Sequence, residues 1–87
     1  MKILSNAFYA LSGLCFNNKA LAAEIVESPV VDIMKFLLNN NSRNPVLVET
    51  ISSVISNLTF RNDAIKITLG NNGILDSLVN VYNYYGF

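Results

Sequence analysis

The chain has 87 residues, of which 52% are apolar and 14% charged, and six basic and six acidic side chains leave it without net charge. This length allows one domain, residues 1–87, and the apolar composition excludes a disordered tail, which would be charged and poor in branched aliphatic residues. The basic residues are scattered, whereas a phosphate backbone requires several cations on one face. We therefore expect no nucleic-acid partner.

The first expected helix spans residues 2–16. Apolar side chains at helical spacing form a stripe along it, at Ile3, Ala7, Ala10, Leu11 and Leu14. A lysine followed by apolar residues also opens secretory leaders. However, residues 7–16 match residues 51–60, and a leader is not expected inside a chain. We therefore interpret this segment as a structural helix.

Cys15 is the only cysteine, so the sequence contains no pair for an internal disulfide, as is usual in a reducing compartment. Its position on the apolar side of the helical pattern predicts a small core residue. No apolar run approaches the ~20 residues of a membrane span. We expect an intracellular protein without membrane contact, in the cytoplasm or alternatively in the nucleus.

A shorter helix is expected over residues 18–27 and ends at the break Ser28-Pro29. A third helix then carries the apolar residues between 30 and 38. The turn "NNNSRN", residues 39–44, closes this part of the chain. Its last residue, Asn44, is expected to cap the next helix, and Pro45 suits that helix's first turn.

The longest helix follows this turn. Its apolar residues recur at i, i+4, i+7, i+8 and i+11, which defines one helical face: Leu47, Ile51, Val54, Ile55 and Leu58. A short helix over residues 62–70, a break at Asn72-Gly73 and a final helix to residue 84 complete the chain. The β-branched residues mildly favour strands, but in none of these segments do apolar and polar residues alternate with a period of two, as they do in a half-buried strand.

The second half of the sequence is an imperfect repeat of the first. "YALSGLCFNN", residues 9–18, returns 44 positions later as "SVISNLTFRN", residues 53–62, and the apolar positions coincide almost throughout, without gaps in the alignment. A period in the forties is typical of stacked helical units or of propeller blades. The helical spacing within the unit excludes blades.

The segments "ALSGLCFNNKALAAEIVESPVVDIMKFLL", residues 10–38, and "VISNLTFRNDAIKITLGNNGILDSLVNVY", residues 54–82, resemble armadillo repeats. That family's unit has three helices and ends in a pattern like Ala-Leu-x-Asn-Leu. Residues 54–58, "VISNL", fit this ending, and residues 10–14, "ALSGL", fit it with Gly in place of Asn. The resemblance implies an all-α, right-handed α-solenoid of three-helix repeats, with related HEAT-like repeats as the alternative fold.

The resemblance also divides the chain. Residues 2–16 correspond to the third helix of a partial repeat, residues 18–60 to a complete repeat, and residues 62–84 to the first two helices of a further repeat. Solenoid units bury their apolar faces against neighbours, yet both ends of this chain are apolar. Two interpretations follow. Either the chain is a piece of a longer array, or its ends pair with another chain, including a second copy in a homo-oligomer.

The armadillo resemblance implies a groove of third helices that holds an extended peptide. An asparagine grips the peptide backbone there, because a carboxamide both donates and accepts hydrogen bonds. The candidates for contact with a peptide or protein partner are Asn6, Tyr9, Thr50, Ser53, Asn57 and Arg61, with Asn57 at the asparagine position. The aromatic tail "YNYYGF" supplies expected end contacts, because aromatic residues dominate interfaces: Tyr82, Tyr84, Tyr85 and Phe87.

Catalytic chemistry lacks its usual residues. Glu24 and Glu27 are three positions apart on an expected helix, which is typical of a solvated face, and the sequence has no His, Cys pair or Gly-rich loop. We expect no catalytic residue, metal or cofactor. The sequence favours a non-enzymatic interaction module or scaffold that binds protein through the third-helix groove or the open ends. The alternative is a purely structural subunit inside a larger complex, without a free ligand.

Overall fold

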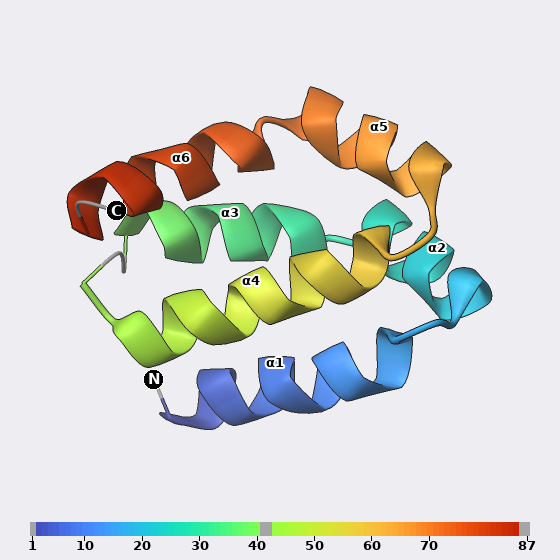
Figure 1. Cartoon of the computed structure of the whole chain (residues 1–87). Coiled ribbons are helices and arrows are strands. Elements are labelled where there is room, and N and C mark those ends of the chain that lie inside the picture. Colours follow the sequence, from blue (N-terminus) through green and yellow to red (C-terminus); the bar gives the residue numbers. More distant parts are fainter. Residues whose placement is uncertain (1, 41–42, 86–87) are drawn as a thin grey trace.

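The computed structural model describes residues 2–40 and 43–85. These residues form helices joined by short turns, without a strand, so the expected all-α class is confirmed (Figure 1). The helices are α1 (Lys2–Cys15), α2 (Lys19–Glu27), α3 (Val30–Asn40), α4 (Pro45–Thr59), α5 (Asp63–Asn72) and α6 (Ile74–Tyr85).

Asparagine side chains begin three of these helices. The Oδ1 atoms of Asn18, Asn44 and Asn62 accept hydrogen bonds from the backbone N–H three residues later, at 3.1, 3.2 and 3.3 Å. Each bond satisfies a donor that the first helical turn leaves unpaired. Asn18 and Asn62 are 44 residues apart, so α2 and α5 begin in the same way.

The turns before α2 and α5 also share a backbone conformation. Asn17 has a φ of 53° and Arg61 a φ of 49°, in the left-handed region that residues other than glycine seldom occupy. The turns before α3 and α6 differ from one another. The Ser28 hydroxyl accepts from the Val30 N–H at 3.2 Å in the first, whereas Gly73, with a φ of 93°, ends α5 in the second.

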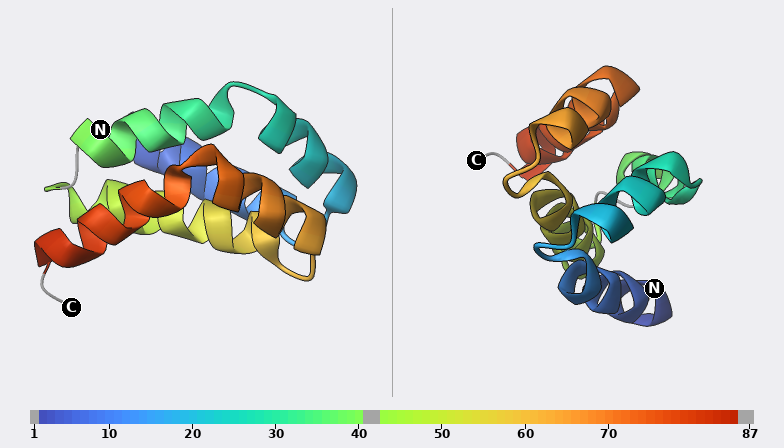
Figure 2. Two further views of the ribbon diagram at one scale, coloured as in Figure 1. Left: turned by 90° about the horizontal axis from the view of Figure 1, so that it is seen from above. Right: turned by 90° about the vertical axis from the view of Figure 1, so that its right-hand side faces the viewer.

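Each helix of the first half packs on its counterpart in the second half. α1 lies against α4, α2 against α5 and α3 against α6 (Figures 1 and 2). α4 occupies the middle of the molecule, with α1 on one side and the α3–α6 pair on the other. The sequence repeat is therefore also a repeat of helix packing.

The core is centred on α4. Its predicted apolar face is buried: Leu47, Ile51, Val54, Ile55 and Leu58. Cys15 is also buried, as its place in the helical pattern predicted. The remaining core side chains come from the five other helices: Phe8, Ala22, Ile25, Val31, Met34, Leu37, Leu38, Ile65, Leu69, Ile74 and Val81.

The apolar stripe of α1 faces outward, unlike the equivalent face of α4. Ile3 is 85% exposed and Leu14 is 66% exposed, and Ala7 and Ala10 are exposed as well. The buried side of α1 is instead Ser5, Phe8, Ser12 and Cys15. The reason is that α1 packs on α4 and α2, and no described helix covers its other side.

Candidate interaction surfaces

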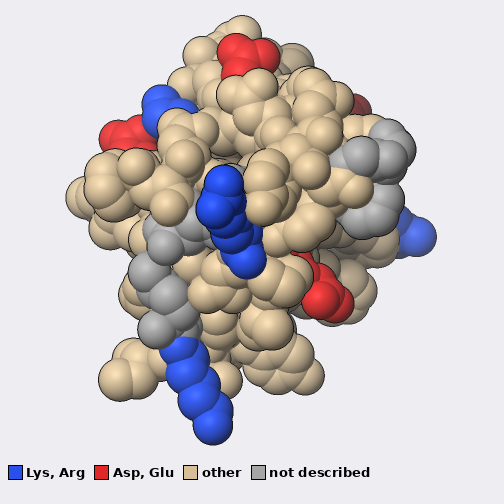
Figure 3. Space-filling view, turned by 90° about the vertical axis from the view of Figure 1, so that its left-hand side faces the viewer, with Lys and Arg blue, Asp and Glu red and all other residues tan. Residues whose placement is uncertain are grey.

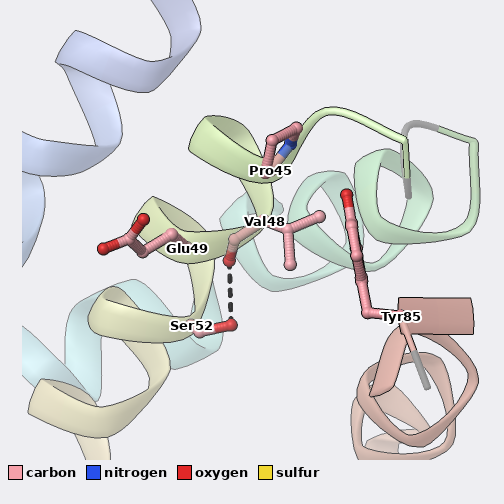
Figure 4. A pocket seen from close by; sticks show the side chains of 5 residues that line it. All are labelled: Pro45, Val48, Glu49, Ser52 and Tyr85. Atoms are coloured by element: carbon pink, nitrogen blue, oxygen red, sulfur yellow. Dashed lines mark hydrogen bonds between the residues drawn. The ribbon is translucent and has the colours of Figure 1, made fainter. Parts of the chain in front are cut away.

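A groove with an apolar lining lies between α4 and α6. One part, of about 390 Å³, is lined by Pro45, Val48, Glu49, Ser52 and Tyr85 (Figure 4). A second part, of about 250 Å³, is lined by Val48, Ser52, Leu78, Val81, Tyr82 and Tyr85. Because the two parts share Val48, Ser52 and Tyr85, they form one surface, which we call the α4–α6 groove.

Two helices position the side chains of the α4–α6 groove. Val48 and Ser52 are one turn apart on α4, and the Ser52 hydroxyl donates to the Val48 carbonyl oxygen at 2.8 Å. Tyr85 faces Val48 from α6, and Glu49 turns its carboxylate away from Tyr85 (Figure 4). The Tyr84 ring meets the Tyr85 ring edge to face, with centroids 5.0 Å apart. The groove therefore has an apolar floor with one carboxylate at its rim.

The α4–α6 groove is the repeat counterpart of a junction that is closed elsewhere in the molecule. Its residues Val48, Ser52, Leu78, Val81 and Tyr82 correspond, 44 positions earlier, to Leu4, Phe8, Met34, Leu37 and Leu38. Four of those five counterparts are buried, and Leu4 packs against them. By contrast, Tyr82 is 55% exposed. No described segment lies over the groove, so the second copy of this junction stays open, although Val81 at its base is buried.

At the opposite end of the molecule, exposed apolar residues again have buried counterparts in the other half. Ile3 and Leu14 on the outer face of α1 are exposed, whereas their counterparts Leu47 and Leu58 on α4 are buried. We call the exposed residues Ile3, Ala7, Ala10 and Leu14 the α1 stripe. This stripe is thus the uncovered version of the face that α4 buries.

Helices α3 and α6 each have one more exposed apolar residue whose counterpart in the other half is buried. Ile33 on α3 is about half exposed, whereas its counterpart Ser77 on α6 is buried. Leu75 on α6 is about half exposed, whereas its counterpart Val31 on α3 is buried. Exposed apolar residues at both ends therefore occupy positions that are buried where the two halves meet.

Two of the predicted contact residues, Asn57 and Ser53, lie together between α4 and α1. Asn57 Nδ2 donates to the carbonyl oxygen and to Oγ of Ser12, at 2.8 and 2.7 Å. The hydroxyls of Ser12 and Ser53 share a further hydrogen bond of 2.8 Å. The side-chain nitrogen of Asn57 is therefore engaged in joining the two stacked helices.

The other four predicted contact residues do not gather at that point. Tyr9 and Asn6 are exposed on α1, and the Arg61 guanidinium lies 5.2 Å from the centre of the Phe60 ring. Thr50 differs from the expectation of a groove-facing residue, because it is only 8% exposed. Its hydroxyl donates to the Val46 carbonyl oxygen at 2.7 Å, and its side chain lies on the covered side of α4.

Three of the predicted end contacts, Tyr82, Tyr84 and Tyr85, lie at the C-terminal end of α6. Tyr85 lines both parts of the α4–α6 groove, and Tyr82 lines the smaller part. Tyr84 is about half exposed, and the Arg43 guanidinium lies 5.9 Å from the centre of its ring. Phe87 lies outside the described residues.

Sequence reasoning did not single out Val48, Ser52 or Leu78 as surface residues of a site. The signal that identifies them is the 44-residue shift together with burial. Their counterparts Leu4 and Met34 belong to the closed junction, so the shifted positions mark the equivalent junction that the described helices leave uncovered. Burial is known only from the structure, and the shift alone does not say which junction is open.

The electrostatics of these surfaces are weak. Basic and acidic side chains are few and scattered on the face shown in Figure 3, without a large patch of one charge. Burial raises the pKa of the Cys15 thiol above its ordinary value, and a backbone hydrogen bond opposes part of this effect. Along residues 2–40 and 43–85, no helix combines the length and apolar character needed to cross a membrane.

Comparison with models of known protein families, with curated proteins and with solved structures gave no match to this chain.

Proposed function

We propose that the chain is a non-enzymatic protein-binding module, built as a short right-handed α-solenoid of armadillo-like repeats. Its partner contributes an amphipathic helix, which lies in the α4–α6 groove with its apolar face against Val48, Leu78 and Tyr82. The observation that carries this proposal is that the same positions in the first half form a junction that is closed and buried.

The arrangement of helices supports the solenoid. Equivalent helices of the two halves lie against each other in all three pairs, so each half is one layer of a stack. In such stacks a layer buries its apolar face only against a neighbour. The uncovered apolar positions at both ends are then the surfaces that a further layer or a partner covers.

The α4–α6 groove is a better binding site than the row of third helices around Asn57. The side-chain nitrogen of Asn57 already donates two hydrogen bonds to Ser12, and Ser53 bonds to the same hydroxyl. A peptide that used these groups would have to break bonds between α1 and α4. A helix in the α4–α6 groove would instead displace water from a mainly apolar lining.

A purely structural subunit is the second candidate. The specific observation in its favour is that uncovered apolar residues occur at both ends, Ile3 and Leu14 at one and Tyr82 at the other. A subunit enclosed by neighbours on both sides would present such faces. In that case the isolated chain is poorly soluble and selects no free peptide.

The proposed function is tested by selection from a displayed library of random 15-residue peptides, the length of α4. We expect enriched peptides to carry apolar residues at i, i+4, i+7 and i+11, because that spacing lines one helical face. Tyr82→Glu should weaken their binding by about 30-fold, since it places a charge in the groove. Titration of labelled selected peptides measures this change.

Asn80→Glu is the matched control. Asn80 lies on the same helix, and both it and its counterpart Phe36 are exposed, so this position faces solvent in both halves. The control variant should bind the selected peptides as the unaltered chain does. A library without enriched helices, or peptides that Tyr82→Glu binds normally, contradicts the proposed function.

A further inference from the structure

We propose that the helix that fills the α4–α6 groove is α1 of a second copy of this chain, so that copies join head to tail. This proposal rests on the proposed function and names the partner of the same groove. Helix α1 of the second copy would then pack on α4 of the first copy in the same way that α4 packs on α1 within one chain.

The first support is the match between the α1 stripe and the face that closes the internal junction. α4 packs on α1 and α3 with its buried apolar face. The corresponding residues of α1, 44 positions earlier, are Ile3, Ala7, Ala10, Leu11 and Leu14. Of these, Ile3 and Leu14 are largely exposed. Each copy therefore presents both an open groove and a helix with apolar residues in the register that fills it.

Charge gives the register a specific test. Ser5 and Val46 line one shallow hollow between α1 and α4. Glu49 lies 44 positions after Ser5, and Lys2 lies 44 positions before Val46. In the junction between two copies, Glu49 of one copy and Lys2 of the next would therefore occupy these two places. The groove's rim carboxylate would therefore face a lysine across the new junction, which favours association.

The half-exposed residues of α3 and α6 extend this contact. In the internal junction, Val31 of α3 and Ser77 of α6 are buried. In the next junction their counterparts are Leu75 of one copy and Ile33 of the other. Both are now about half exposed and would be covered when α3 of the second copy stacks on α6 of the first.

A junction of this kind joins two different surfaces, so every added copy leaves one groove and one α1 stripe open. Such heterologous contacts give open series of copies unless the rotation closes a ring. A two-fold dimer would instead pair like surfaces. Variants that block one surface at a time distinguish the two arrangements.

The test uses sedimentation velocity on two single-surface variants of the full chain. Leu14→Asp blocks the α1 stripe and Tyr82→Glu blocks the groove. Both side chains are more than half exposed, so the fold should persist, as circular dichroism would verify. We expect the unaltered chain to form a concentration-dependent series of species, and each variant to dissociate about 30-fold more readily.

The decisive sample is an equimolar mixture of the two variants. Leu14→Asp keeps its groove and Tyr82→Glu keeps its α1 stripe, so we expect a two-chain species that grows no further. Ala23→Asp and Asn80→Glu, at positions exposed in both halves, should associate as the unaltered chain does. Two monomeric variants that do not combine, or a variant that still dimerises alone, overturn head-to-tail joining.

A charge exchange tests the register itself. Glu49→Lys or Lys2→Glu alone should raise the dissociation constant about 3- to 5-fold, because each places like charges together. The chain carrying both changes should return to within about 2-fold of the unaltered value. Additive weakening in the double variant overturns the proposed register.

The peptide selection separates failure of this proposal from failure of the proposed function. If the unaltered chain stays monomeric while Tyr82→Glu rejects the selected helices, the groove binds another protein's helix and the second copy is the wrong occupant. If the chain stays monomeric and selects no helix, both proposals are wrong.

Discussion

Ser12 joins α1 to α4 through polar contacts, because it accepts hydrogen bonds from Asn57 and its hydroxyl shares one with Ser53. Ser12→Ala leaves those groups without a hydroxyl partner, and we expect the free energy of unfolding to fall by about 1–2 kcal/mol. Denaturant titration at low micromolar concentration measures this change.

Ser56 supplies the control for Ser12, since it stands 44 positions later and is exposed on α4. Ser56→Ala should change the free energy of unfolding by less than about 0.5 kcal/mol, and alanine's helix propensity favours a small gain. Equal losses in the two variants would show that Ser12 does not join the layers as described.

Cys15 predicts an alkaline loss of stability. Burial raises the pKa of its thiol from 9.0, so above that pH the unfolded chain releases the proton while the folded chain retains it. The folded state then binds more protons, and the free energy of unfolding falls as pH rises. Cys15→Ala lacks this contribution and should show a shallower decline above about pH 9. Parallel declines would contradict a raised pKa.

At the scale of the helices, the α5–α6 junction depends on one glycine. Gly73 has a φ of 93° at the end of α5, a conformation that a Cβ disfavours by about 1–2 kcal/mol. Gly73→Ala should therefore lower the free energy of unfolding by about that amount, as thermal or chemical unfolding would show.

Gly70 provides the contrast within the same helix. A Cβ at Gly70 would meet only the Leu75 side chain, at 3.8 Å, which is ordinary contact. Gly70→Ala should raise the free energy of unfolding by about 0.5–1 kcal/mol, because alanine is the better helix former. A destabilised Gly70→Ala with an unaffected Gly73→Ala would reverse the roles given to these glycines.

Helix positions could be predicted from local signals, but the face that α1 buries could not. Asn44 with Pro45, and Gly73, mark helix ends through backbone chemistry that does not depend on the rest of the fold. α1 has two apolar faces, one with Ile3 and one with Phe8. Helical spacing permits either to be buried, and only the neighbouring helices decide which one is.

The candidate contact residues illustrate the same limit. The sequence motif predicts that Asn57 and Ser53 contact a peptide, but their hydrogen bonds to Ser12 depend on how α1 stacks on α4. Thr50 was expected at a surface, yet its side chain lies on the covered side of α4. Contacts between layers are set by packing distance and rotation, which the sequence period does not contain.

At the scale of the whole molecule, two stacked layers leave complementary surfaces at opposite ends. The α4–α6 groove and the α1 stripe are open versions of two surfaces that meet inside the molecule. Apolar area exposed in this way gains free energy when another helix covers it. The proposed binding through the ends would use the same kind of packing that holds the two halves together.

The most direct measurement is the mass of the unaltered chain in solution, followed by sedimentation equilibrium from low to high micromolar concentration. Open, complementary ends predict an average mass above the 9.6 kDa of one chain, rising as the concentration rises. A well-folded chain that remains at the mass of one copy throughout that range would contradict them.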